Sequence, residues 1–352
     1  MRLLNLERSL LLLLITLLVF ACSRAMPESN LEDTGQADTF SHASSTSCRS
    51  IRHDSGETRI CGQPQRLVAL DPHGMDLLLS LGVQPVGYAE EARAQIGSAG
   101  IGEAMTQIQY LGYRITHPPA HVGSRTEPSL EAITRLKPDL IFGENFSQFS
   151  YPTLAKIAPT LFLSGRERNT WQRNLLILGQ ALQKESQAQQ VIDHHQQRLA
   201  AAKVKLQPLS TEVKVLLLAF AGLNNIEIFG PQTYPGGLLQ DLGIELVLPA
   251  QFQAGESYSG VSLEVLPELK ANQIIVMASG QNTISTAKAQ WQQNAILRLL
   301  PASRANQVYF VDYQLWGRIR GPIAAELVLE QICQMFFPEQ NMGKELKSAA
   351  RR

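Results

Sequence analysis

The chain has 352 residues, a length typical of two or three domains with enough sequence to bury well-packed cores. Basic and acidic residues number 31 each, so the formal net charge is zero, and charged residues make up only 18% of the chain. Nucleic acid is therefore excluded as a partner, because binding to phosphates needs a basic excess that this sequence lacks.

The N-terminus predicts export. An apolar run over residues 10–20 follows two arginines, and it is shorter than a comfortable membrane span. The run ends in Val-Phe-Ala-Cys at 19–22, which resembles the lipobox of bacterial lipoproteins. This motif predicts removal of a signal peptide at 1–21, lipidation of Cys22, and a periplasmic or cell-surface protein anchored to a bacterial membrane. Cleavage near Ala25 by the ordinary signal peptidase is the alternative.

Residues 22–47 contain few bulky apolar side chains, so this stretch is expected to be a flexible tether. Cys48 and Cys61 bracket a strand-compatible segment with Gly56-Glu57 at its centre. A hairpin closed by a disulfide is predicted, because export supplies an oxidising compartment. A zinc site is the alternative. Cys333 lies in an apolar helical pattern without neighbouring metal ligands, and we expect it to be a small buried hydrophobe.

An alternation of strands and helices starts at residue 65 and predicts a parallel α/β lobe over 48–169. It opens with a strand at 66–70, a loop at 71–74, a helix at 75–81 and a strand at 85–88. A last strand is expected at 160–163, after a short helix that ends at Pro159.

A long helical stretch follows. Residues 171–206 contain no proline, and apolar residues recur there at close to helical spacing. We expect a break near 183–185 and then a helix of about 20 residues, which spans about 30 Å at 1.5 Å per residue. This helical segment, 170–207, is predicted to join two lobes as a stiff connection.

The second lobe is predicted over 208–338, with the same order of strands and helices as the first. It begins with a strand at 213–218 and finishes with a strand at 308–311 and a helix from 322 to 336. A polar tail follows at 339–352.

One short pattern occurs twice. Ser129-Leu130-Glu131, with Leu136-Lys137 and Ile141 after it, recurs in the same register as Ser262-Leu263-Glu264, Leu269-Lys270 and Ile274. Each copy predicts an amphipathic helix leading into a buried strand, so Glu131 and Glu264 should occupy equivalent places on the two lobes. This arrangement predicts a functional site that lies between the lobes or involves both of them.

Two α/β lobes joined by one long helix, on an exported chain, resemble the substrate-binding proteins of bacterial iron-siderophore and cobalamin ABC importers. The resemblance covers residues 64–338 and is carried by Pro-Gln-Arg-Leu-Val-Ala-Leu-Asp at 64–71, Leu-Gly-Val-Gln-Pro-Val-Gly at 81–87, Val-Gly-Ser-Arg-Thr-Glu-Pro-Ser-Leu-Glu at 122–131 and Lys-Pro-Asp-Leu-Ile at 137–141. It implies two Rossmann-like lobes with central parallel-type sheets and a single backbone helix. It also implies a ligand held in the inter-lobe cleft, no catalysis and no intrinsic cofactor.

The resemblance gives the repeated glutamates a role. In this family one acidic residue on each lobe meets an arginine pocket on the paired permease subunits, and Glu131 and Glu264 match those positions. Two carboxylates related by pseudo-symmetry suit a two-fold partner. The alternative is that each glutamate only stabilises the start of its helix, behind Ser129 or Ser262.

Arginines are the predicted ligand contacts. Arg125 resembles the arginine that contacts iron-coordinating oxygens in hydroxamate-siderophore binders, although it could be a surface residue paired with Glu127. An extended conformation over 316–321 would place Trp316, Arg318 and Arg320 on one side, because side chains alternate along a strand. We expect that side to face Arg125 across the cleft. A solvated loop is the alternative.

Aromatic side chains complete the predicted cleft. Tyr258 resembles in position an aromatic residue that lines the cleft in this family. Phe146, Tyr151 and His73 lie on first-lobe loops that are also expected to face the cleft. Each of the last three could equally be core or rim. Several arginines beside aromatic rings suit an anionic ferric chelate of the citrate or carboxylate-hydroxamate type.

The predicted function is that of a monomeric extracytoplasmic lipoprotein that captures a ferric siderophore and delivers it to an ABC permease. A cobalamin or haem receptor of the same fold is the main alternative, and a direct metal-ion receptor is a weaker one. An enzyme is disfavoured, because the sequence has neither a Gly-x-Ser-x-Gly elbow nor a His-Glu-x-x-His motif.

Overall fold

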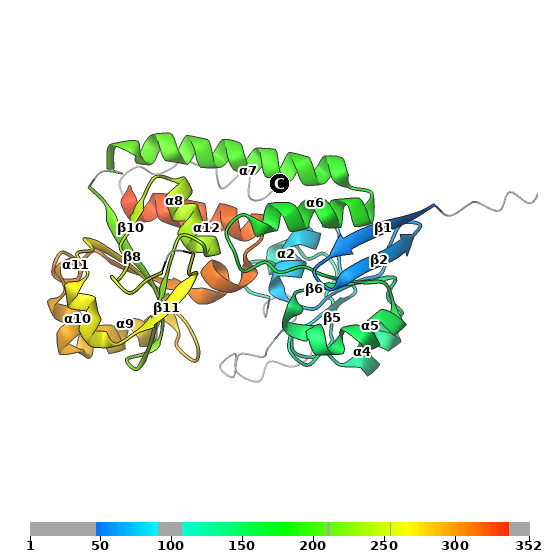
Figure 1. Ribbon diagram of the computed structural model, residues 1–352, viewed down its shortest axis with the longest axis horizontal. Coiled ribbons are helices and arrows are strands. Elements are labelled where there is room, and N and C mark those ends of the chain that lie inside the picture. Colours follow the sequence, from blue (N-terminus) through cyan, green and yellow to red (C-terminus); the bar gives the residue numbers. More distant parts are fainter. Residues whose placement is uncertain (1–46, 91–107, 210–211, 254, 338–352) are drawn as a thin grey trace, which may run out of the picture. The chain divides into compact units, whose positions relative to one another are not determined.

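The computed structural model describes residues 47–90, 108–209, 212–253 and 255–337 (Figure 1). The predicted signal peptide, Cys22 and the polar tail lie outside the described residues, as does nearly all of the predicted tether. Among the residues that are described, no helix is both long enough and apolar enough to span a membrane.

The first sheet is parallel throughout, in the order β5-β4-β3-β6-β7. Its strands are β3 (Leu67–Ala69), β4 (Gly87–Tyr88), β5 (Ala120–His121), β6 (Leu140–Gly143) and β7 (Thr160–Phe162). The three inner strands of this order bury every residue, as expected for a parallel sheet covered on both faces. The covering helices are α2 (Pro72–Ser80), α4 (Leu130–Leu136) and α5 (Tyr151–Ile157), with the short η1 (Gly112–Arg114) and η2 (Asn145–Ser150). These elements form what we call the first lobe.

The second sheet is mixed, in the order β11-β9-β8-β12-β13, with β10 paired to β8. Its strands are β8 (Lys214–Gly222), β9 (Asn225–Phe229), β10 (Glu245–Leu246), β11 (Tyr258–Val261), β12 (Gln273–Ala278) and β13 (Val308–Asp312). Its helices and turns are α8 (Tyr234–Asp241), η4 (Leu263–Glu268), α9 (Ile284–Gln293), α10 (Ala295–Leu299), α11 (Pro301–Arg304), η5 (Gln314–Ile319) and α12 (Pro322–Phe336). This is the second lobe. The predicted α/β class is confirmed, although β9 and β11 run antiparallel to their neighbours.

The long helix predicted between the lobes is present. After α6 (Thr170–Leu182) the chain turns at Gln183, whose φ of 57° is left-handed, and then forms α7 (Glu185–Leu206). At 22 residues, α7 is about 33 Å long. Its buried side chains recur at spacings of three and four: Ala188, Ile192, His195, Ala202 and Leu206. This stripe packs on α6 and α12, so α7 is in contact with helices of both halves (Figure 1).

The repeated sequence pattern forms two related but unequal units. In the first, Ser129 accepts a hydrogen bond from the Ala132 amide at the start of α4, which leads into β6. In the second, the same pattern forms the 3₁₀ turn η4, which leads into β12. The prediction of a second amphipathic α-helix is therefore wrong. Pro267 lies inside η4, and proline has no amide proton with which to continue an α-helical ladder.

The N-terminal hairpin consists of β1 (Cys48–His53) and β2 (Gly56–Cys61), and a disulfide joins Cys48 to Cys61. The Asp54 amide donates to the Phe162 carbonyl at 2.9 Å, which attaches the hairpin to β7. Arg49 donates to the carbonyl oxygens of Gln180 and Ala181 at the end of α6. The hairpin is therefore fixed to the first lobe at two places.

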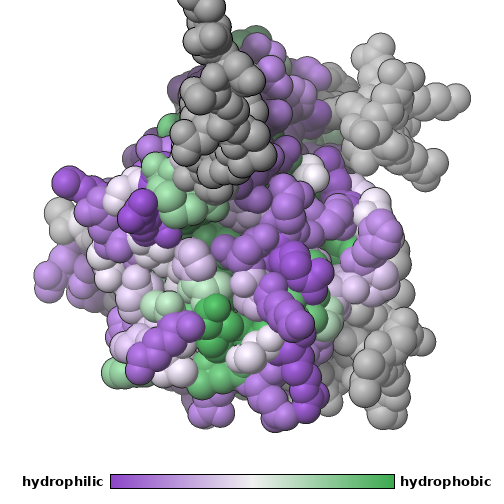
Figure 2. Space-filling view, turned by 90° about the vertical axis from the view of Figure 1, so that its right-hand side faces the viewer, coloured by the Kyte–Doolittle hydropathy of each residue, from purple (hydrophilic) through white to green (hydrophobic). Residues whose placement is uncertain are grey.

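Figure 2 faces the end of the molecule where the hairpin, α4 and α5 lie in Figure 1. Most of this face is hydrophilic, but a hydrophobic patch lies low on it. The helices α4 and α5 carry partly buried apolar side chains, among them Leu130, Leu136 and Ile157. Glu131 projects from α4 with its side chain 76% exposed. Apolar surface and an exposed carboxylate therefore occur together at this end.

Candidate ligand-binding cleft

Loops that follow parallel strands bring the candidate residues of the cleft together. Glu90 follows β4 and Arg125 follows β5, while Phe146 and Arg166 come after β6 and β7. The carboxyl ends of parallel strands share one edge of a sheet, where open α/β folds bind ligands. Arg318 follows β13, at the corresponding edge of the second sheet.

Two guanidinium groups contact one aromatic ring in the first lobe. The Cζ atom of Arg125 lies 4.3 Å from the centroid of Phe146, and that of Arg166 lies 4.7 Å from it. The hydroxyl of Ser147 donates to the carbonyl oxygen of Arg125 and so fixes the loop that carries it. Because a ring face attracts cations without neutralising them, this arrangement gathers positive charge at the carboxyl edge of the sheet.

Aromatic side chains line up on the second lobe. Tyr258 is half exposed and stacks on Phe229, with ring centroids 5.9 Å apart. Phe229 in turn meets Tyr313 edge to face at 6.1 Å, just before η5. Tyr258 therefore belongs to an aromatic row that ends beside the turn carrying Arg318.

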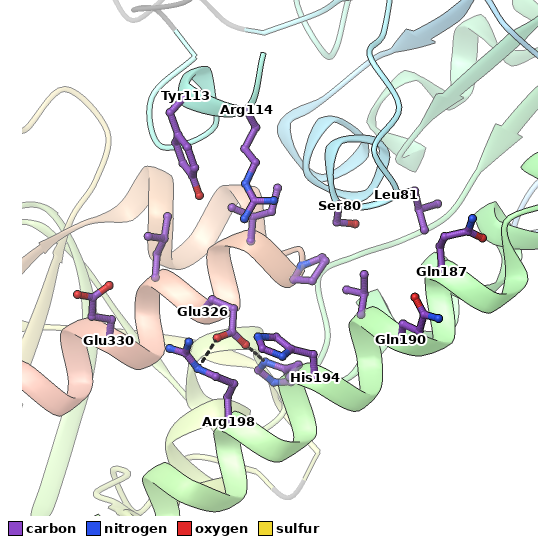
Figure 3. A pocket seen from close by; sticks show the side chains of 15 residues that line it. Ser80, Leu81, Tyr113, Arg114, Gln187, Gln190, His194, Arg198, Glu326 and Glu330 are labelled. Carbon is purple, nitrogen blue, oxygen red and sulfur yellow. Dashed lines mark hydrogen bonds and ion pairs between the residues drawn. The ribbon is translucent and has the colours of Figure 1, made fainter. Parts of the chain in front are cut away.

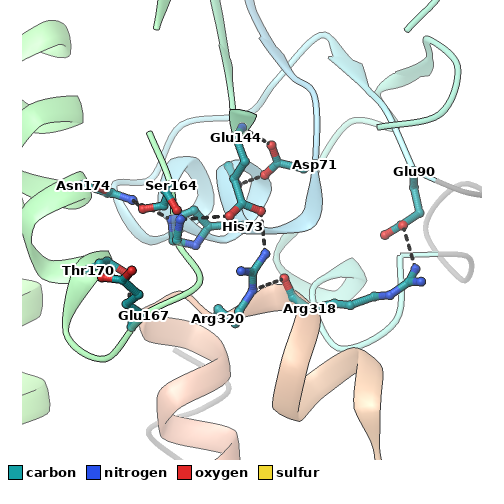
Figure 4. A network of polar contacts seen from close by, with 12 residues as sticks. Asp71, His73, Glu90, Glu144, Ser164, Glu167, Thr170, Asn174, Arg318 and Arg320 are labelled. Atoms are coloured by element: carbon teal, nitrogen blue, oxygen red, sulfur yellow. Dashed lines mark hydrogen bonds and ion pairs between the residues drawn. The ribbon is translucent and has the colours of Figure 1, made fainter. Parts of the chain in front are cut away.

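Arg318 approaches the first lobe through Glu90. The shortest distance between their charged atoms is 3.6 Å. Glu90 also accepts hydrogen bonds from Gln314 at 3.1 Å and from the hydroxyl of Tyr88 at 2.8 Å. The two lobes thus meet here through side chains that are only partly exposed, with Arg318 at the boundary (Figure 4).

The prediction of an extended segment at 316–321 is wrong, since residues 314–319 form the π-helix η5. Successive side chains on a helix point around its axis, so Trp316, Arg318 and Arg320 do not share a side. Trp316 is fully buried and donates to Gln331 at 2.6 Å, which makes it a core residue. Arg320 is 4% exposed and is ion-paired inside the protein. Neither residue is accessible to a ligand in the cleft.

Two other predicted contacts also have internal partners. His73 is fully buried in α2, and its Nε2 lies 3.1 Å from the side-chain nitrogen of Asn174. Tyr151 packs against the hairpin: its hydroxyl lies 3.3 Å from Nε2 of His53, and its ring tilts onto Phe162. The predictions that His73 and Tyr151 line the cleft are therefore wrong.

A buried polar network lies between the lobes (Figure 4). Glu144 accepts a hydrogen bond from Arg320 at 2.5 Å, and Asp71 accepts one from the Glu144 amide at 2.5 Å. Burial opposes ionisation of Glu144, but Arg320 and other donors outweigh it and lower the pKa of Glu144. Burial and the charge of Glu144 raise the pKa of Asp71 to about 7. Burial lowers the pKa of His73 to about 4, so its imidazole is neutral at neutral pH.

A second buried carboxyl group, that of Asp76, connects the two lobes. Asp76 of α2 accepts hydrogen bonds from the amides of Ile323 and Ala324 at 3.0 and 2.9 Å, at the start of α12. Its burial raises the pKa of Asp76 to about 7, and these amides only partly offset that effect. A carboxyl whose pKa is higher folded than unfolded stabilises the protein below the unfolded pKa. That stability is lost as the pH rises through the folded value.

We therefore predict that Asp76→Asn reduces the pH dependence of stability. Between pH 5 and pH 8 the wild-type chain should lose roughly 1–3 kcal/mol more unfolding free energy than the variant. Denaturant unfolding of both proteins at the two pH values measures this difference. Asp193→Asn, an exposed carboxylate of α7, is the control and should follow the wild type. Parallel curves for wild type and Asp76→Asn would contradict the prediction.

Several residues of the site were not predicted. Arg166 comes three residues after the strand expected at 160–163, and that position was the available signal for it. Glu144 directly follows β6, but nothing in the sequence distinguishes it from a solvated loop carboxylate. Phe229 meets Tyr258 through pairing of β9 with β11, and Tyr313, which follows β13, contacts Phe229. These are contacts between distant segments that no local pattern reveals.

The paired glutamates are both exposed and both lie in the first turn of their helical segments. Glu131 forms an ion pair with Arg135 one turn later, at 2.5 Å. Glu264 occupies the corresponding place in η4. The predicted equivalence in sequence is thus matched by equivalent placement before a central strand of each sheet, β6 or β12.

A pocket of about 370 Å³ lies among α7, α12, α2 and η1 (Figure 3). Arg198 approaches Glu326 to 3.0 Å at its floor, and Nδ1 of His195 lies 2.9 Å from the same carboxylate. These contacts attach α7 to α12. No predicted ligand-binding residue lines this pocket, so it is distinct from the cleft described above.

Comparisons with known proteins agree with this architecture. The family model described as "Periplasmic binding protein" matches residues 67–315. The Fe(3+)-citrate-binding protein YfmC of Bacillus subtilis (strain 168) is 27% identical over 330 residues, covering 93% of this chain and 95% of that protein. The Fe(3+) dicitrate-binding periplasmic protein FecB of Escherichia coli (strain K12) is 30% identical over 290 residues, covering 81% and 89%.

Among solved structures, Staphylococcus aureus SirA complexed with staphyloferrin B superimposes with a TM-score of 0.68. It is 26% identical and covers 82% of this chain and 98% of SirA. These relatives are solute-binding proteins, which confirms the prediction of a binding protein that is not an enzyme. The chain belongs to the periplasmic binding protein family, as its sequence motifs predicted.

Proposed function

We propose that this protein captures a ferric chelate rich in carboxylates, of the ferric citrate or carboxylate-siderophore type, in the cleft between its lobes. The observation that carries the proposal is the pair of guanidinium groups, Arg125 and Arg166, held on the ring of Phe146 at the carboxyl edge of the first sheet. YfmC is named for binding ferric citrate and FecB for binding ferric dicitrate, and both names support this class of ligand.

The chemistry of the cleft favours an anion. A guanidinium stays charged under partial burial, and its forked donors match the paired oxygens of a carboxylate. Aromatic rings such as Tyr258 add contact area for the body of a ligand at little entropic cost. A corrin offers these guanidinium groups no cluster of carboxylates to bind, so a cobalamin receptor fits the cleft less well.

We further propose that the protein acts outside the cytoplasm as a lipoprotein anchored through Cys22 and delivers its ligand to an ABC permease. The lipobox-like motif at 19–22 supports the anchor. A single acyl-modified cysteine at the end of a 25-residue stretch would leave the lobes free to sample a partner in the membrane. Glu131 and Glu264 are the proposed contacts with the permease.

A fluorescence titration tests the ligand assignment. Ferric citrate should quench the tyrosine and tryptophan emission saturably, because an iron chelate near Tyr258 and Tyr313 accepts their excitation energy. Iron-free citrate should give a weaker response. Ferric hydroxamates, cobalamin and haem are titrated in parallel. Tighter binding of cobalamin or haem than of every ferric chelate tested would contradict the proposal.

A further inference from the structure

The buried carboxylate of Glu144 is bonded to residues of both lobes. Glu144 is 1% exposed, and each of its oxygens has a different partner. Oε1 accepts a hydrogen bond from the Gly165 amide at 2.9 Å, next to Arg166. Oε2 accepts one from Nη2 of Arg320 at 2.5 Å, on the second lobe. With this exposure the side chain cannot touch a ligand. Figure 4 shows its place in the polar network.

Arg320 also bonds the backbone of Arg318. Its Nε donates to the carbonyl oxygen of Arg318 at 3.0 Å, while its Nη2 holds Glu144. Arg320 adopts a left-handed φ of 55° at the residue where η5 ends. One guanidinium therefore fixes the backbone of the residue whose side chain reaches toward Glu90 in Figure 4.

The first lobe in turn holds Glu144 rigidly. Its amide donates to Asp71, whose other oxygen accepts from the Gly74 amide and caps α2. Two residues further along the chain, Phe146 carries the guanidinium groups of Arg125 and Arg166. Glu144 is thus connected, through its own bonds or through its neighbours in the chain, to Arg125, Arg166 and Arg318.

The network explains why a buried ion pair occurs here. A buried pair gives little net stability over apolar side chains of the same shape, because both charges must lose their water. Its hydrogen bonds do fix geometry, since each donor and acceptor has one defined direction. The Glu144–Arg320 pair spans the lobe boundary, where the distance between two sets of cations is set.

We propose that Glu144 is a positioning residue for ligand binding: it fixes the separation between Arg166 on the first lobe and Arg318 on the second. This inference rests on the proposed function, because it assumes that both arginines bind one anionic ligand. The spacing of the cations then selects chelates whose carboxylates are spaced to match. Glu144 contributes through Gly165 and Arg320, without contact to the ligand.

Two variants test this role. Glu144→Gln removes the charge and weakens the bond to Arg320, whereas Arg320→Lys keeps both charges but cannot bond Glu144 and the Arg318 carbonyl together. Arg320→Lys leaves a charged pair inside the protein, so it guards against the possibility that Glu144→Gln fails to fold. Arg168→Gln is the matched control. It breaks the partly buried ion pair of Arg168 with Asp241 of α8 and leaves Glu144, Arg318 and Arg320 unchanged.

The first measurement needs no ligand. Hydrogen exchange of the amides in 312–321 and of Gly165 should be faster in Glu144→Gln, and that of 312–321 also in Arg320→Lys. Exchange in 312–321 should not change in Arg168→Gln. The second measurement is the dissociation constant for ferric citrate. It should rise about tenfold in Glu144→Gln, the equivalent of roughly one well-placed contact.

A double-mutant cycle separates positioning from a general loss of structure. In an Arg318→Ala background, Glu144→Gln should cost clearly less affinity than in the wild type, because its effect passes through Arg318. Equal costs in both backgrounds, or an equal loss in Arg168→Gln, would overturn the proposal. If the wild type does not bind ferric citrate, the proposed function fails, and unchanged exchange in 312–321 would by itself refute the positioning role.

Discussion

Replacing Arg125 and Arg166 together with alanine should weaken the binding of ferric citrate by at least about a hundredfold. Each guanidinium contributes charge-assisted hydrogen bonds worth roughly 1.5–3 kcal/mol, and about 1.4 kcal/mol corresponds to a factor of ten. Folding should change little, because Arg166 is exposed and Arg125 is only partly buried, and both contact Phe146 outside the core. Fluorescence titration measures the affinity, and thermal unfolding checks stability.

The control for this double variant must change the net charge equally. Arg298→Ala with Arg304→Ala removes two exposed arginines from α10 and α11, on the second lobe. Its affinity should remain within about twofold of the wild type, since long-range charge effects are screened within about 10 Å at ordinary ionic strength. Equal losses in the two double variants would mean that only overall charge matters and would remove Arg125 and Arg166 from the site.

Local pattern predicted those parts of the cleft that follow directly from strand ends. Arg125 and Phe146 were both predicted on loops of the first lobe, Arg125 in the loop before the repeated motif and from its resemblance to a family motif, and the two side chains are in contact. Their role in ligand binding stays a prediction. Arg166 follows the same rule at β7 but stands in no motif. A fuller use of topology would have found it, since every parallel strand contributes a loop to the same edge.

The segment after β13 shows where sequence reasoning fails. The alternation of Trp316, Arg318 and Arg320 suggested a strand, but the same residues are also compatible with a helical turn. The outcome depends on tertiary contacts: Trp316 fills the core against α12, and Arg320 finds Glu144 across the lobe boundary. The sequence pattern made Arg320 a candidate ligand contact. Its guanidinium instead bonds Glu144, which comes from a distant segment of the chain.

Helix periodicity was the strongest predictor of the fold. The apolar stripe of α7 lies on one face with spacings of three and four, and the helix begins within two residues of the expected break. The second copy of the repeated motif was predicted less well, because Pro267 converts the expected helix into the turn η4. Despite this difference in backbone, Glu264 keeps the exposed first-turn position of Glu131.

The ion pair of Glu131 contributes little to the stability of the fold. Glu131 and Arg135 are 76% and 75% exposed, and surface pairs of this kind contribute only about 0–1 kcal/mol. Glu131 can therefore exchange Arg135 for another cation at little cost. Leu130 and Leu136, partly buried on the same helix, provide adjacent apolar surface. An apolar centre with charge at its rim is the usual composition of a transient interface.

Glu131→Ala combined with Glu264→Ala should therefore reduce uptake of iron-labelled ferric citrate by cells at least about tenfold, because both charges that we propose to orient the protein on the permease are lost. The affinity of the purified double variant for ferric citrate should equal that of the wild type, since neither side chain belongs to the cleft. Glu185→Ala with Glu245→Ala, two exposed glutamates on α7 and β10, is the control and should transport normally. Loss of ligand affinity in the Glu131 and Glu264 variant would contradict a docking role, and normal uptake would show that these carboxylates only stabilise the turns that they begin.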